Sequence, residues 1–159
     1  MEDIYGKCPA VGQLWIYGNG FKNVVVAVVV PDGAALHAFA VSKGWWSAAE
    51  IPAPVGALDA PFRAAAAALG EDAEKRAALS AWALGELRKF ESGLVGFEKI
   101  KAVYVELTMD AMGQGFTEEN ECLTPTMKKR RKQLTDKYVP VLAQLYNEVG
   151  EPQKAGEHW

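Results

Sequence analysis

Apolar residues along the chain first fall into two short runs. The segments "QLWIY" (residues 13–17) and "VVVAVVV" (residues 24–30) are rich in β-branched and aromatic residues, a composition that favours strands. The polar stretch "GNGFKN" separates them, and its Asn-Gly step predicts a hairpin turn with positive φ values. We therefore expect two antiparallel strands, the second of which is buried.

Helical patterns follow the hairpin. Asp32 is the expected N-cap of a helix that continues through "AALHAFAVSK" to Gly44. Residues 45–62 contain three prolines and no periodicity, which predicts a loop or an insertion. Two helices are then expected at residues 63–70 and 72–90. The second places apolar residues at helical spacing, so that they share one face: Leu79, Ala83, Leu87, Phe90 and Leu94.

The last third of the chain predicts one more strand and an amphipathic helix. Residues 99–107, "KIKAVYVEL", alternate as a strand does, and a polar loop follows at residues 108–121. Pro140 interrupts the terminal helix, so we expect a kink or two short helices. One stripe of that helix is apolar: Leu134, Tyr138, Val141 or Leu142, Leu145 and Val149. Strands and helices in this order predict one α+β domain.

Composition narrows the class of protein. A chain of 159 residues, half apolar and 23% charged, is typical of a single soluble domain. Cys8 and Cys122 form no CxxC pair, which favours free thiols and an intracellular location. The chain shows no signal peptide, and its longest apolar run has seven residues where a membrane helix needs about 20.

Motifs for a self-contained active site are absent. His37 and His158 are the only histidines, and neither has a partner at metal-ligand spacing, so no metal site is expected. The sequence also contains no GxSxG, P-loop or GxGxxG motif.

The most unusual feature is a run of five cations, residues 128–132, in a chain of net charge −3. The run lies between a Thr-Pro-Thr turn and the terminal helix, where Pro125 restricts the backbone and could aim a lysine side chain. By composition alone, a solvated face or a nuclear-import or nucleic-acid patch is the stronger interpretation.

Four stretches together resemble the C-terminal subdomain of long-chain fatty-acid CoA ligases, which are AMP-forming members of the adenylate-forming superfamily. They are "EDIYGKCPAVGQLWIYGNGFKNVVVAVVVPD", "GFEKIKAVYVE", "LTPTMKKRRKQL" and, more weakly, the tail ending in "LYNEV". They cover most of the chain outside residues 44–78, in the family's order and spacing.

This resemblance implies a fold and a role. The fold would be a small three-stranded sheet, a hairpin plus a later strand, packed with helices as a mobile lid. Residues 1–159 would form that single lid subdomain, with an insertion at about residues 44–70. In the family, a fatty acid and ATP form an acyl-adenylate and diphosphate, and CoA then displaces AMP to give acyl-CoA.

The motif also implies site residues. Lys128 matches the lysine that stabilises charge on the reacting oxygens during adenylation. Lys129, Arg130 and Arg131 would contact phosphates, CoA or the partner domain, or else be solvated. The family often has a hydrophobic residue or Phe before the lysine and a proline near position 132, where this chain has Met127 and Lys132.

The family's hinge aspartate, phosphate loop, adenine pocket and acyl tunnel belong to a large adenylation domain that is not in these residues. We therefore expect the chain to be inactive alone, to need that domain in cis or trans, and to meet Mg only through ATP bound there. The expected location is cytoplasmic, or peripheral on an organelle membrane. Two other functions stay open: a free-standing module that binds an acidic partner or nucleic acid through residues 128–132, and a regulatory pseudo-subunit.

Two further pairs of residues carry expectations. Glu2 and Asp3 are expected to cap a helix N-terminus and to act as partners of its dipole, not as an acid or a base. Trp45 and Trp46 either pack against the helices or touch a membrane surface.

Overall fold

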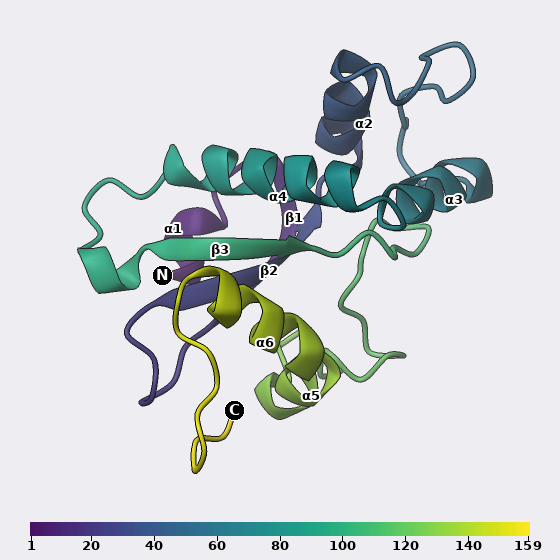
Figure 1. The fold of residues 1–159 in the computed structure, drawn as a ribbon. Helices are drawn as coiled ribbons and strands as arrows, with labels where there is room; N and C mark the ends of the chain where they lie inside the picture. Colours follow the sequence, from purple (N-terminus) through teal and green to yellow (C-terminus); the bar gives the residue numbers. More distant parts are fainter.

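A three-stranded sheet with the order β1-β2-β3 forms the centre of the fold (Figure 1). Strand β1 (Val11–Tyr17) pairs antiparallel with β2 (Val25–Pro31), and β3 (Ile100–Val105) pairs parallel with β2. The computed structural model describes all residues, 1–159. The α+β class, the hairpin and the later third strand are thus confirmed.

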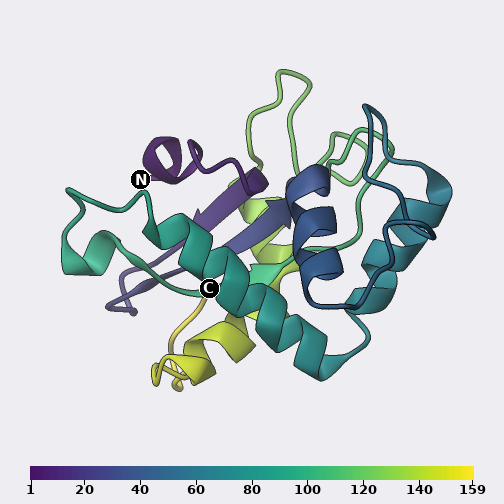
Figure 2. The same ribbon diagram turned by 90° about the horizontal axis from the view of Figure 1, so that it is seen from above.

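Strand β2 is buried on both faces. Residues 26–30 are each at most 1% exposed, because the strand lies between two neighbours and helices cover the sheet from both sides. Helix α4 (Ala73–Arg88) packs on β3 from one side, and α6 (Val139–Glu148) packs on β3 and β2 from the other (Figure 2). This burial explains why the strand is a continuous apolar run with no alternation.

The turn between β1 and β2 differs from the prediction. Neither Asn19 nor Gly20 has a positive φ value. Instead, the side-chain oxygen of Asn19 accepts a hydrogen bond from the Phe21 amide at 2.8 Å. The backbone carbonyl of Asn19 accepts a second one from the Lys22 amide at 3.2 Å. The connection spans residues 18–24, and a loop of this length does not need the left-handed geometry of a two-residue turn.

Helix α2 (Gly33–Ser42) starts as predicted. A carboxylate oxygen of Asp32 accepts a hydrogen bond from the Ala35 amide at 3.0 Å, which satisfies one free N–H of the first turn. Gly44 follows the helix with φ of 74°, a conformation that suits glycine. Both predicted boundaries of this helix are confirmed.

Helix α3 (Ala60–Leu69) begins before its predicted start at Arg63. Asp59 caps it by accepting from the Phe62 amide at 2.8 Å, and Pro61 lies in its first turn. Proline is tolerated there, because the first amides of a helix have no partner within it. The predicted loop therefore ends before Asp59 and not at Phe62.

The apolar stripe of α4 is confirmed only in part. Leu79, Ala83 and Leu87 are buried against the sheet, but Phe90 and Leu94 follow the end of the helix at Arg88 and are half-buried. The short 3-10 helix η1 (Gly96–Glu98) then leads into β3.

The terminal segment forms two helices, as predicted for an interrupted helix. Tyr138 separates helix α5 (Arg131–Lys137) from α6 and caps both helices. Pro140 occupies the first turn of α6. Leu134, Tyr138, Leu142 and Leu145 are all buried. No helix of the chain has the length and apolar character required to cross a membrane.

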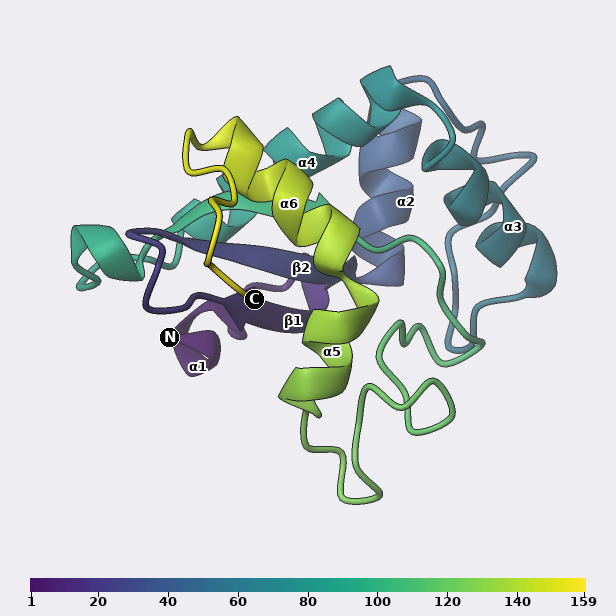
Figure 3. The same ribbon diagram turned by 60° about the horizontal axis from the view of Figure 1, so that its bottom comes forward.

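Residues 149–159 fold back along the loop between β1 and β2 (Figure 3). Trp159 stacks on Tyr146 with ring centroids 5.7 Å apart and meets the ring of Tyr17 at 6.1 Å. The ammonium of Lys22 lies over the rings of Tyr146 and Trp159 and forms an ion pair of 2.9 Å with Glu157. We call residues 149–159 the C-terminal strap.

Candidate functional site

Lys128 lies in a small hairpin that precedes α5. Leu123 and Lys129 form an antiparallel bridge, the Thr124 amide donates to the Lys128 carbonyl at 2.8 Å, and the Met127 amide donates to the Thr124 carbonyl at 2.8 Å. The hairpin protrudes beyond α5, away from the sheet (Figure 3). Residues 123–129, which we call the lysine hairpin, therefore present Lys128 on an exposed projection of the molecule.

Side-chain hydroxyls fix the backbone of this turn. The Thr124 hydroxyl accepts a hydrogen bond from the Lys128 amide at 3.1 Å and lies 3.1 Å from the Thr126 hydroxyl. Met127 has φ of 66°, which is uncommon for a residue with a side chain. These bonds hold a left-handed residue directly before Lys128, so the backbone at the lysine is defined although its side chain is in solvent.

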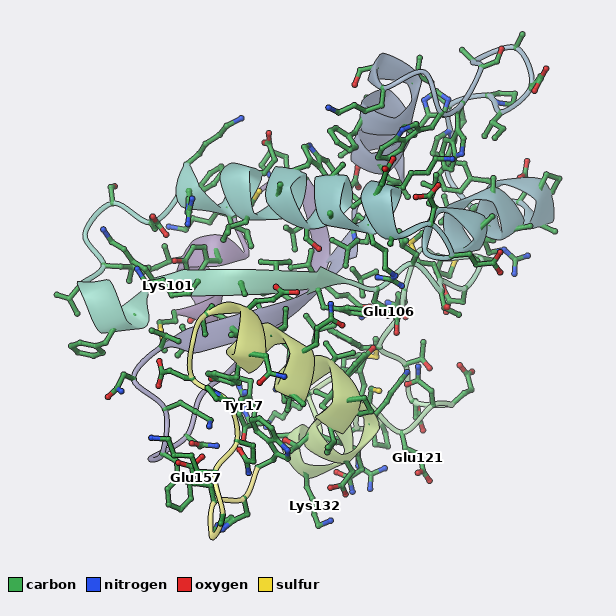
Figure 4. The ribbon with its side chains drawn as sticks, in the orientation of Figure 1. Tyr17, Lys101, Glu106, Glu121, Lys132 and Glu157 are labelled. Carbon is green, nitrogen blue, oxygen red and sulfur yellow. The ribbon has the colours of Figure 1, made fainter.

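The five cations divide into paired and unpaired groups. Lys129 and Arg131 both form ion pairs with Glu2, and Lys132 pairs with Asp136 at 2.8 Å. Lys128 and Arg130 have no carboxylate within ion-pair distance. Figure 4 shows the Lys132 side chain projecting outward from α5. Three cations of the run are therefore paired, but they share two carboxylates, so two of the five positive charges are offset within the chain.

Glu2 connects the N-terminal helix α1 (Glu2–Tyr5) to the lysine hairpin. Its Oε1 accepts a hydrogen bond from Arg131 at 2.7 Å, and the Lys129 ammonium lies 2.8 Å from Oε2, outside good hydrogen-bond alignment. Burial alone would raise the pKa of Glu2, but the close positive charge of Lys129 and the charge and hydrogen bond of Arg131 outweigh it and lower the pKa. Glu2 is thus ionised and bound to two cations.

An open groove of about 1020 Å³ runs beside this cluster. Its walls come from the N-terminus, the β1–β2 loop, η1 and the start of α5. Charged side chains of both signs line it, among them Glu2, Lys22, Glu98, Lys129 and Arg131. The paired charges make it poorly suited to a strongly anionic ligand such as a nucleic-acid backbone.

Sequence reasoning missed the partners of Glu2. Glu2 and Asp3 lie in the first turn of α1, as their role as dipole partners requires, but the predicted cap is wrong: Met1 is the N-cap, and no side chain makes a capping bond. Nothing in the local sequence links Glu2 to Arg131, because the two residues are 129 positions apart.

Other singled-out residues are parts of the packing. Trp46 is buried and meets the ring of Phe62 edge-on at 5.3 Å, while Trp45 is half-buried beside Phe39 at 5.5 Å. The packing alternative for these tryptophans is therefore confirmed. His37 is buried, and its Nε2 lies 2.7 Å from the Ile51 carbonyl.

Cys8 and Cys122 are both free and buried. Burial is the main cause that raises the pKa of each thiol, so neither is activated as a nucleophile. No group of three or more His, Cys, Asp or Glu side chains is arranged to hold a metal ion.

Two solved structures contain a region with the same fold as this chain. The adenylation domain of a carboxylate reductase from Mycobacterium chelonae superposes with a TM-score of 0.61 at 24% identity, over 92% of this chain and 17% of that one. An adenylation and carrier didomain of carboxylic acid reductase from Segniliparus rugosus, solved with AMP, gives a TM-score of 0.55 over 94% of this chain and 16% of that one. The chain therefore shares its fold with a part of these adenylation domains.

Sequence relatives identify the family. A probable CoA ligase of Humulus lupulus is 33% identical over 95% of this chain, and long chain acyl-CoA synthetase 2 of Arabidopsis thaliana is 31% identical over 94%. No family model matches the chain. The chain belongs to the long-chain acyl-CoA synthetases and corresponds to a C-terminal part of them. It spans about 19% of the length of these relatives.

Proposed function

We propose that this chain is the lid of a long-chain fatty-acid CoA ligase and that Lys128 is its adenylation lysine. In the complete enzyme, the fatty-acid carboxylate attacks the α-phosphorus of ATP, diphosphate leaves, and the CoA thiol then displaces AMP. The lid delivers Lys128 for the first step. The large adenylation domain supplies the ATP and acyl sites, so the lid by itself is inactive.

One observation carries this proposal: Lys128 is an exposed ammonium on a protruding, hydrogen-bonded hairpin, and no carboxylate of the chain pairs with it. A catalytic cation delivered to another domain has to be free in the lid and fixed at its backbone. Both conditions hold here. A lysine serves this role well because its compact charge can follow oxygens whose charge changes during attack.

The proposal assigns different roles to the neighbouring cations. Lys129 and Arg131 each form an ion pair with Glu2. Either side chain has to leave Glu2 before it can contact a phosphate. Arg130 is half-buried and has no ion pair, so it is the better candidate for a contact with phosphate or with the large domain. The internal pairing of the run also argues against nucleic-acid binding.

Complementation tests the function. A long-chain relative truncated before the region matched here is mixed with this chain, and acyl-CoA formation is followed with fatty acid, ATP and CoA. We expect activity only in the mixture. Lys128→Ala removes it, whereas Lys132→Ala, an exposed control in the same run, retains it. Equal activity of the two variants would remove Lys128 from the mechanism.

A further inference from the structure

The adenylation scheme proposed above gives Glu2 no role, although Glu2 contacts two cations of the basic run. Its carboxylate contacts residues on both sides of the junction between the lysine hairpin and α5. Lys129 belongs to the base of the hairpin through its bridge to Leu123, and Arg131 is the first residue of α5. One side chain from the N-terminal helix therefore holds the hairpin and the helix together.

Burial makes this contact more than a surface ion pair. The side chains of Glu2 and Lys129 are 20% and 29% exposed, whereas Arg131 is 63% exposed and both members of the Lys132–Asp136 pair exceed 60%. Partly desolvated pairs are screened less by water and salt, and a carboxylate with two cationic partners is held more firmly than one with a single partner. The Glu2–Lys129 contact therefore restrains the hairpin, whereas the exposed Lys132–Asp136 pair lies within α5 and does not touch it.

The same contacts shape the charge around Lys128. Without Glu2, Lys128 would lie beside two further free cations, and an approaching anion could bind any of them. With Glu2 ionised, its single negative charge is shared between Lys129 and Arg131 and offsets part of their positive charge, while the exposed ammonium of Lys128 has no carboxylate partner. Glu2 thus both restrains the backbone and lowers the positive charge that competes with Lys128 for an approaching anion.

We propose that Glu2 is a positioning residue for adenylation: it holds Lys129 and Arg131 so that the hairpin presents Lys128 in one orientation. This inference rests on the proposed function of Lys128. It predicts that Glu2 matters for the adenylate-forming step and not for the later attack by CoA, since only the first step uses the lysine.

The test compares Glu2→Gln with Asp136→Asn, because each removes one carboxylate from the same basic run without changing side-chain size. In the chain alone, hydrogen exchange is measured at the amides of Thr124, Lys128 and Arg130, which are hydrogen-bonded within the hairpin region. Glu2→Gln should speed their exchange about tenfold, the effect of losing a charge-assisted bond, and Asp136→Asn should not. Unchanged exchange in β2 shows that the variant is folded.

The second arm uses the mixture with the large domain. Glu2→Gln should slow acyl-adenylate formation about tenfold while thioester formation from preformed acyl-adenylate is unchanged. Equal exchange in the two variants overturns the positioning role, and so does a loosened hairpin with normal adenylation. If the wild-type mixture forms no adenylate, the proposed function fails, and the exchange comparison still decides whether Glu2 orders the hairpin.

Discussion

The Tyr138 hydroxyl donates a hydrogen bond of 2.6 Å to the Glu106 carboxylate, and both side chains are buried. Glu106 follows β3, and Tyr138 lies at the break between α5 and α6. The bond therefore ties the sheet to the point from which α5 extends back toward the lysine hairpin. A buried carboxylate is costly without a donor, so this contact stabilises the helix break as well as the fold.

Tyr138→Phe should destabilise the chain by about 1 to 3 kcal/mol, because it leaves Oε1 of the buried Glu106 carboxylate without its donor, while Oε2 keeps a longer bond from the Thr108 amide. Tyr146→Phe is the matched control, since the Tyr146 hydroxyl donates at 2.9 Å to the neutral carbonyl of Val24. We expect that control to lose about 1 kcal/mol or less. Urea unfolding measures the free energy of unfolding of both variants. Equal losses of stability would show that a charged acceptor makes the Tyr138 hydrogen bond no stronger than the Tyr146 bond to a neutral carbonyl.

Buried tyrosines predict instability in alkali. Burial raises the pKa of Tyr5 from 10.0 to about 12, and the pKa values of Tyr138 and Tyr146 are also raised, mainly by burial. The unfolded chain releases these protons near pH 10 while the folded chain retains them. The free energy of unfolding should therefore be unaffected by these groups below pH 10 and fall above it. Tyr5→Phe should flatten that fall, and an unchanged slope would contradict the assignment.

Met127 offers a test of the hairpin's geometry. Its φ of 66° is easy for glycine and unfavourable for a β-branched residue. Met127→Gly should keep or slightly raise stability, whereas Met127→Val should lose about 1 to 2 kcal/mol. Thermal unfolding of the two variants supplies the comparison. Equal tolerance of glycine and valine would mean that the left-handed turn is not maintained in solution.

The C-terminal strap should hold the β1–β2 loop. Trp159→Ala removes an aromatic ring from Tyr146 and uncovers Lys22, so stability should fall by about 1 to 2 kcal/mol. Amides of residues 21–23 should also exchange faster, because their hydrogen bonds lie in this loop and to the strap. Trp45→Ala, which removes a tryptophan elsewhere, should leave those amides unchanged.

Local sequence signals predicted the elements that depend on neighbours along the chain. Asp32 marked the start of α2, the valine run marked β2, and Pro140 marked the break in the terminal helix. The early start of α3 was missed because a proline was interpreted as a loop signal, although it fits a first helical turn.

Features that depend on distant contacts could not be predicted. Asn19 suggested a tight turn, but the loop is longer and the C-terminal strap packs against it. The pairing of Glu2 with the basic run was equally invisible, since its members lie at opposite ends of the sequence. Lys128 was identified through resemblance to the family's motif. The structure adds its exposure and its lack of an ion pair, and its catalytic role stays a prediction.

The central claim is that the Lys128 ammonium assists acyl-adenylate formation. The most direct measurement is the rate of that step in the mixture with the large domain, for Lys128→Ala against Lys132→Ala, alongside thioester formation from preformed acyl-adenylate. We predict a loss of about 10²- to 10³-fold for Lys128→Ala in the first step, little change in the second, and no effect of Lys132→Ala. Equal adenylation rates for the two variants, or an equal loss in both steps, would contradict the account.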